Sequence, residues 1–125
     1  MSKILIVEDN EKNMKLVRDI LRHKGYDTVE ATTGEEGWRL VQECRPDLVL
    51  MDIQLPDVDG ITVLGRIRAD AGLARIPVVA VSASVMPDDR LKIAGSGFDD
   101  FVPKPISLKS FVATVERFLR DGRPA

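Results

Sequence analysis

The hydrophobic residues of this chain fall into two alternating kinds of segment. Short apolar runs without polar alternation predict strands buried on both faces, as in a parallel sheet. Apolar residues three or four positions apart predict amphipathic helices. We expect strands over residues 3–7, 27–31, 48–52, 77–81 and 99–102, the second being the most polar and therefore at an edge. We expect helices between Asn10 and Gly25, over 34–44 and 61–67, from Pro87 to about Gly95, and over 108–119.

Five strands that alternate with five helices predict an α/β fold with a parallel sheet between two helical layers. Helices cover both faces when the strand order reverses, and the crevice at the reversal is the usual ligand site. We therefore predict a flavodoxin-like, doubly wound (βα)5 domain with strand order 2-1-3-4-5 over residues 1–120, followed by a flexible tail at 121–125. No segment remains for an output domain.

Composition narrows the function classes. The net charge of −2 argues against a nucleic-acid footprint, and no apolar run is long enough to span a membrane. The start of the chain enters a strand directly, without the pattern of a signal peptide. Cys44 is the single cysteine, so no internal disulfide can form. These features predict a cytoplasmic protein.

Polar residues stand where the apolar strands end. Glu8 and Asp9 follow the first strand, Asp52 ends the third, Ser82 ends the fourth, and Lys104 follows the fifth. Because the carboxyl ends of parallel strands share one edge of the sheet, these side chains are expected on one rim. Three neighbouring carboxylates repel one another and favour a hard cation, and Mg²⁺ prefers oxygen ligands.

Each of these residues also has a simpler interpretation: Ser82 alone is uninformative, and Lys104 alone would be a solvated lysine. Glu8-Asp9-Asn10 could serve only as a helix cap, and Asp52 could be a structural carboxylate bonded to loop amides. His23 is interpreted as a surface residue and Trp38 as a packing residue, with Gly37 making room for the indole.

Several segments together resemble the receiver domains of two-component response regulators, from end to end. The matching stretches are Ile4–Asn10, Pro46–Pro56, Gly60, Ile76–Ala83 and Lys104-Pro105. Within that family the chain is most similar to stand-alone regulators of the DivK type, through Asn13–Leu16, Gly25-Tyr26, Met51–Pro56 and Lys104–Ser107.

The resemblance implies a role for each site residue. Asp52 would accept the phosphoryl group from a histidine kinase or a histidine phosphotransferase. Mg²⁺ would be bound by Asp9, Asp52 and the backbone carbonyl of Gln54, with Glu8 acting through a water molecule. Lys104 would contact the phosphoryl group, and the Lys104–Pro105 bond would be cis.

The resemblance also implies how the phosphoryl group would be sensed. Ser82 would turn toward it and Phe101 would rotate inward, although Phe101 could also be plain core. Gln54 and Ser84 would tune a slow autodephosphorylation. A downstream protein would bind the face formed by residues 87–95, the last strand and the last helix. The chain would thus be a phosphoacceptor rather than an enzyme.

Three rival functions are weaker. A Mg²⁺-dependent phosphatase of the haloacid dehalogenase type usually has an aspartate two residues after its nucleophile, where this chain has Gln54. A dinucleotide-binding protein would need a glycine fingerprint after the first strand, which is absent. An unphosphorylated scaffold would not need the full set of acids and the lysine.

Overall fold

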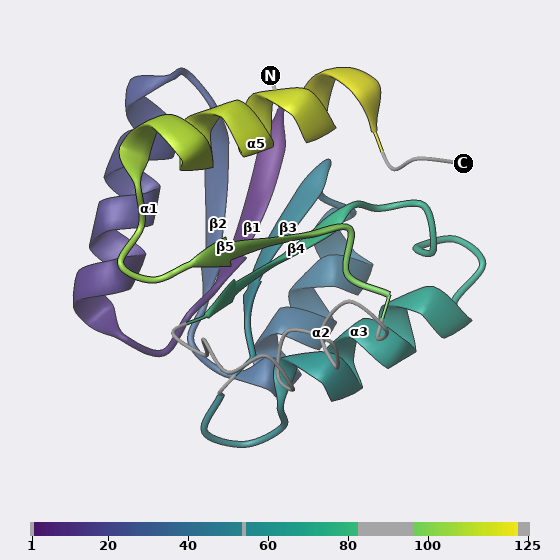
Figure 1. The fold of residues 1–125 in the computed structure, drawn as a ribbon. Coiled ribbons are helices and arrows are strands. Elements are labelled where there is room, and N and C mark those ends of the chain that lie inside the picture. The colour runs from purple at the N-terminus through teal and green to yellow at the C-terminus, as the bar shows by residue number, and fades with distance from the viewer. Residues whose placement is uncertain (1, 54, 83–96, 123–125) are drawn as a thin grey trace.

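The computed structural model describes residues 2–53, 55–82 and 97–122 of the 125-residue chain, and Figure 1 shows their arrangement. Its elements are β1 (Lys3–Val7), α1 (Glu11–His23), β2 (Asp27–Ala31), α2 (Gly34–Cys44), β3 (Leu48–Asp52), α3 (Gly60–Ala69), β4 (Val78–Ser82), β5 (Asp100–Pro103) and α5 (Leu108–Asp121). The helix predicted over 87–95 lies outside the described residues.

The strands form a parallel sheet in the order β2-β1-β3-β4-β5, which confirms the predicted order. The order reverses at β1 and β3, which lie side by side at the centre with Val7 opposite Met51. Each strand of the central three is buried almost along its whole length, as their uninterrupted apolar runs predicted.

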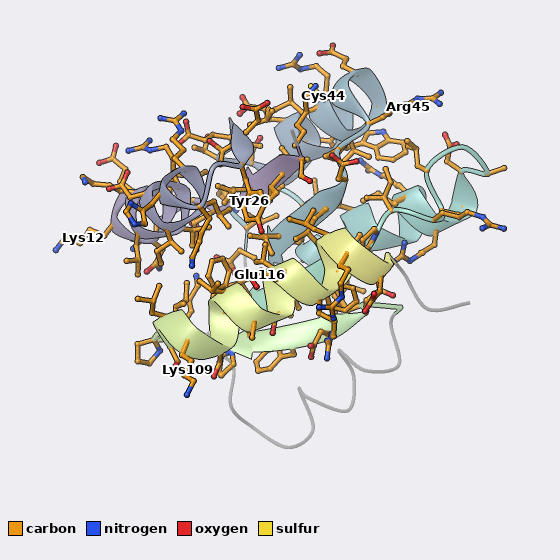
Figure 2. All side chains as sticks on the ribbon, turned by 90° about the horizontal axis from the view of Figure 1, so that it is seen from above. Lys12, Tyr26, Cys44, Arg45, Lys109 and Glu116 are labelled. Atoms are coloured by element: carbon orange, nitrogen blue, oxygen red, sulfur yellow. The ribbon has the colours of Figure 1, made fainter. Side chains whose placement is uncertain are left out.

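The sheet separates two cores. Alternate residues of β1 point to opposite faces, so that Ile4 and Ile6 join one core while Leu5 and Val7 join the other. Helices α1 and α5 cover the first face and α2 and α3 cover the second (Figure 1). Figure 2 shows Tyr26 on the side of α1 and α5, where it packs against the first core, and half-buried Cys44 at the end of α2.

Capping residues fix the helix ends. Asn10, Thr33 and Asp59 each accept a hydrogen bond from an amide in the first turn of α1, α2 and α3. Gly25, with a φ of 88°, follows α1 in the left-handed conformation that was predicted for it. The predicted end of the last helix was too early, since α5 continues to Asp121 and its buried stripe reaches Phe118.

Gly37 serves a different neighbour from the one predicted. A Cβ atom at this position would lie 2.9 Å from a methyl carbon of Val7, so the glycine allows α2 to approach β1 closely. Trp38 is half-buried and packs against the core between the sheet and α2, as predicted for a packing residue.

Arg68 joins several segments at the amino end of β4. Its guanidinium donates hydrogen bonds of 2.7 to 3.2 Å to the backbone carbonyls of Ala74, Ile76 and Gly97. It also forms an ion pair of 2.8 Å with Asp99, whose side chain is only 6% exposed. Asp99 accepts a further hydrogen bond from the amide of Val78. One arginine thus fixes α3 against the starts of β4 and β5. These amino ends of the strands lie opposite the carboxyl ends at which the acids are expected.

Among the described residues, no helix combines the length and the apolar composition needed to cross a membrane.

Candidate functional site

Three acids meet at the carboxyl ends of β1 and β3. Glu8 and Asp52 follow or end neighbouring strands and are only 4% and 6% exposed, whereas Asp9 is open to solvent. Carboxylate oxygens of the three residues lie within 4.8 Å of one another. The adjacency follows from the register, because Val7 lies opposite Met51 and the next residue on each strand is an acid.

Lys104 reaches the same point from the end of β5. Its Nζ lies 2.7 Å from Oε1 of Glu8 and 3.1 Å from Oδ2 of Asp52. The amide of Lys104 donates to the carbonyl of Ser82, which anchors the residue to the neighbouring strand β4. The structure therefore brings together the three acids and the lysine that the sequence placed on one rim.

Crowding of like charges changes the proton affinity of Glu8. Burial, the hydrogen bond with Asp52 and the charge of Asp52 raise the pKa of Glu8 to about 7, against the opposing effect of Lys104. For Lys104, burial alone would lower the pKa, but its bonds to the two carboxylates raise the pKa above its ordinary value. One ammonium group therefore only partly neutralises the site.

The donor set suits a hard divalent cation. Three carboxylates face one lysine, so the ionised cluster carries two negative charges in excess. Proteins hold Mg²⁺ through a small number of oxygen ligands and leave several of its water molecules in place. The cluster matches this pattern, because its donors are carboxylate oxygens and one of its acids, Asp9, remains open to solvent. Glu8, Asp9 and Asp52 thus fit the ion that the sequence predicts.

The other predicted site residues are placed as follows. Ser82 ends β4 beside the acidic rim and is 1% exposed, and Phe101 is half-buried against the core on the α2 and α3 side. The Lys104–Pro105 peptide bond is cis, which confirms that prediction. Gln54 and Ser84 lie outside the described residues.

Sequence reasoning did not assign a packing or bonding role to the residues that hold the segment after Asp52. Gly60 packs so closely that a Cβ atom there would collide with the backbone carbonyl of Asp52. Asp57 accepts hydrogen bonds from the amides of Gly34 and Glu35, at 2.8 and 3.0 Å. These partners are more than 20 positions away in sequence, so no local pattern could have identified the pair.

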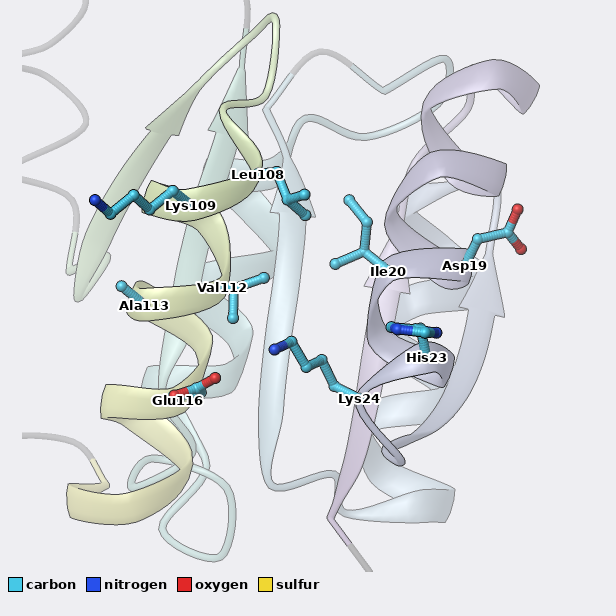
Figure 3. Close-up of a pocket in the computed structure, with 9 residues that line it drawn as sticks. All are labelled: Asp19, Ile20, His23, Lys24, Leu108, Lys109, Val112, Ala113 and Glu116. Carbon is cyan, nitrogen blue, oxygen red and sulfur yellow. The ribbon is translucent and has the colours of Figure 1, made fainter.

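A hollow lies away from the acidic cluster, between α1 and α5 (Figure 3). Its volume is about 910 Å³, and Ile20, Leu108 and Val112 form its apolar part. In Figure 3 Lys24 extends from the end of α1 toward α5, whereas the side chain of Lys109 points away from α1. None of the predicted site residues lines this hollow, so it is separate from the acidic cluster.

Comparison with known proteins gives a consistent result. The sequence profile described as the response regulator receiver domain matches residues 4–116. The polar-differentiation response regulator DivK of Brucella anthropi is 45% identical over 119 residues, covering 95% of this chain and 97% of the relative.

Two solved structures are similar in both fold and sequence. The receiver domain of a sensor histidine kinase from Pseudomonas aeruginosa, with a magnesium ion coordinated in its active-site cleft, has a TM-score of 0.89 and 30% identity, covering 96% of this chain and 98% of that one. The phosphorylated cyanobacterial phytochrome response regulator RcpA has a TM-score of 0.84 and 30% identity, covering 96% and 94%.

Proposed function

Because this chain belongs to the response regulator receiver domain family, we propose that Asp52 is the residue that accepts the phosphoryl group in two-component signalling. The observation that carries the proposal is the place of Asp52. It is a buried carboxylate at the carboxyl end of a central strand, with the ammonium group of Lys104 3.1 Å from its Oδ2. Glu8 and Asp9 lie beside it.

The reaction is a displacement at phosphorus. A carboxylate oxygen of Asp52 attacks the phosphohistidine of a histidine kinase or a histidine phosphotransferase. The new O–P bond forms as the P–N bond breaks, and the imidazole nitrogen keeps the electron pair. Such transfers need positioning and charge neutralisation more than acid–base chemistry. Lys104 is close enough to Asp52 to neutralise part of the charge on the transferred group.

Mg²⁺ would be held by Asp9 and Asp52 with the support of Glu8 and of the predicted backbone carbonyl of Gln54. When bound, the ion supplies positive charge that lowers the repulsion between the carboxylates and the incoming phosphoryl oxygens. The protein contributes the fixed spacing of the acids, which the adjacent strands β1 and β3 set.

Phosphorylation would be converted into a change of surface. An aspartyl phosphate adds nearly two negative charges and new acceptor oxygens, toward which the hydroxyl of Ser82 would turn. Phe101 lies one strand further and would rotate inward, so that the face of residues 87–95, β5 and α5 favours a second pre-existing state. A downstream protein would bind that state. Chemical-shift changes confined to the acidic rim on phosphorylation would contradict this step.

The phosphoryl group would leave slowly by autodephosphorylation. Gln54 and Ser84 flank the acceptor in sequence and would steer the attacking water. The protein itself is a signalling protein and not a classical enzyme.

Intact mass spectrometry tests the central proposal. The chain and its Asp52→Asn variant are incubated with acetyl phosphate and Mg²⁺. We expect one added phosphate on the wild type, none on the variant, and its loss in hydroxylamine, which cleaves acyl phosphates. Failure of the wild type with both acetyl phosphate and phosphorylated histidine kinases would favour the scaffold alternative.

A further inference from the structure

We propose that Asp57 is a positioning residue for phosphoryl transfer, because its carboxylate ties the loop after Asp52 to the first turn of α2. The structure describes residues 53 and 55–59 of this connection between β3 and α3. The inference rests on the proposed function of Asp52, and it adds a residue that lies outside the acidic cluster.

The contact satisfies amides that a helix cannot satisfy by itself. The first amides of α2 have no partner within the helix. Oδ1 of Asp57 accepts from the amide of Gly34 at 2.8 Å, and Oδ2 accepts from that of Glu35 at 3.0 Å. The hydroxyl of Thr33 accepts from the third amide, that of Glu36, at 3.1 Å. A distant loop therefore supplies two of the three caps of this helix.

The charge of Asp57 suits this position. The amino end of a helix carries a partial positive charge, which favours an ionised carboxylate. The hydrogen bonds from the amides of Glu35 and Gly34 hold the pKa of Asp57 below its ordinary value. The lowered pKa favours the ionised form of Asp57, which accepts both hydrogen bonds at this helix end.

The backbone of the loop approaches the start of α2 closely. A Cβ atom on Gly34 would lie 2.7 Å from the carbonyl oxygen of Val58 and 3.3 Å from Oδ1 of Asp57. An ion pair of 3.0 Å between Arg66 of α3 and Glu35 adds a second connection at the same turn of α2. The junction between the loop, α2 and α3 is therefore closely fitted.

The same helix carries the constraint to the other half of the acidic site. Gly37 allows α2 to pack against Val7, and Val7 directly precedes Glu8 and Asp9 on the chain. Asp57 thus connects the segment after Asp52 to the helix that packs on the strand bearing the other two acids. Its loss would let the two halves of the site shift relative to each other, although all three acids would remain.

Asp59 provides a matched control in the same loop. Its Oδ1 accepts from the amide of Thr62 at 2.8 Å and so caps α3, the helix to which the loop leads. Both aspartates are exposed helix caps, but Asp57 alone of the two bonds to α2. A loss specific to Asp57 would therefore report the tie across the site and not the loss of a cap.

The experiment titrates the metal-free chain with Mg²⁺ and measures binding from the changes in amide chemical shifts. It compares four proteins: the wild type, Asp57→Ala, Asp57→Asn and Asp59→Ala. We expect Asp57→Ala to weaken Mg²⁺ binding at least fivefold and to accelerate hydrogen exchange at the amides of Gly34 and Glu35. Asp57→Asn keeps one acceptor oxygen and should recover part of the affinity. Asp59→Ala should change the Mg²⁺ dissociation constant less than twofold.

The outcomes separate this inference from the proposed function. Equal weakening by Asp57→Ala and Asp59→Ala, or an unchanged affinity in both Asp57 variants, would overturn the positioning role. A wild type that binds no Mg²⁺ near Asp52 would overturn the proposed function and this inference with it. If Asp57→Ala does not fold, the comparison of Asp57→Asn with Asp59→Ala decides the question.

Discussion

Glu8 occupies a position that disfavours the ionised form of its carboxyl group. It is nearly buried, contacts Lys104 at 2.7 Å, and shares the site with a second buried acid, Asp52. Many carboxylates that gain a partner on folding become stronger acids. Glu8 behaves in the opposite way, since burial and its acidic neighbour outweigh the lysine and raise its pKa to about 7.

This shift predicts a pH dependence of stability without metal. The folded pKa of about 7 exceeds the value of 4.5 for the free group, so the folded state binds more protons between these values. Glu8 therefore contributes its full stabilisation below pH 4.5. That contribution falls as the pH rises and is lost once the pH has passed through 7. At ~1.4 kcal/mol for each pKa unit, a shift from 4.5 to about 7 corresponds to a loss of about 3.5 kcal/mol at most.

Urea unfolding of the metal-free protein at pH 5 and pH 8 measures this loss. The free energy of unfolding of the Glu8→Gln variant should change less between these two pH values, because its side-chain amide does not titrate. Groups that do not touch Glu8 contribute equally to both proteins, so the difference between the two slopes reports Glu8 together with the side chains bonded to it. Equal slopes would show that Glu8 titrates in its ordinary range.

Individual site residues were predictable where strand order alone places them. Glu8, Asp9, Asp52 and Lys104 all stand at carboxyl ends of strands, and a parallel sheet brings such ends together. Asp57 was not predictable, because its partners come from a tertiary contact between the loop after β3 and the first turn of α2. Gly37 was assigned to Trp38 because sequence neighbours are visible, whereas the approach of α2 to Val7 is a tertiary contact.

Helix α3 offers two glycines in opposite surroundings. A Cβ atom on Gly60 would collide with the carbonyl of Asp52, whereas one on Gly65 would meet no atom within 4 Å. We expect Gly60→Ala to destabilise the protein by about 1 to 3 kcal/mol through overpacking. Gly65→Ala should be neutral or should stabilise it by up to about 1 kcal/mol, since alanine favours the helix.

Chemical denaturation of the two variants tests this contrast, with phosphorylation by acetyl phosphate as a second readout. Gly60→Ala should also slow phosphorylation, because the displaced carbonyl belongs to Asp52, the proposed acceptor. Similar stability of the two variants would mean that the start of α3 can move away from β3 at little cost.

The two arginines of α3 form the second contrast at this scale. Arg68 is mostly buried and joins Asp99 to three carbonyls, while Arg66 forms a more exposed ion pair with Glu35. Truncating Arg68 removes the buried ion pair with Asp99 and the hydrogen bonds to the three carbonyls, so Arg68→Ala should cost about 3 to 5 kcal/mol. Arg66→Ala should cost less than about 1 kcal/mol. Urea midpoints would measure both, and equal costs would refute the special role of Arg68.

For the whole molecule, the order of the strands decides where function lies. The reversal between β1 and β3 places the acids at the carboxyl ends of the strands. Arg68 binds Asp99 at the opposite, amino ends of β4 and β5. Binding of an ion at one edge should therefore stabilise the entire cooperative unit.

Thermal unfolding with and without Mg²⁺ measures this linkage. At a free concentration ten times the dissociation constant, binding adds about 1.4 kcal/mol to the stability. For a chain of 125 residues this raises the melting temperature by about 5 °C. Asp9→Asn should largely abolish the rise, and Glu11→Gln, an exposed acid in the first turn of α1, should retain it. An unchanged rise in Asp9→Asn would place the ion elsewhere.

The overall fold was the most predictable level. Uninterrupted apolar runs identify the strands, and their alternation with helices leaves few topologies for a right-handed doubly wound sheet. The end of α5 was less predictable, because Arg120 and Asp121 are exposed residues whose sequence gives no apolar pattern. The helix continues there on its own backbone hydrogen bonds.

The two outer strands have a consequence for behaviour at high concentration. A sheet with open edges can recruit further strands and aggregate, unless charges or prolines block the edges. β2 carries Asp27 and Glu30, and Glu30 is held by Arg18 at 2.7 Å. At the other edge, β5 is four residues long and contains Asp100 and Pro103, which has no amide hydrogen to donate. Both margins of the sheet thus resist edge-to-edge growth, so the folded chain should stay dispersed even when crowded.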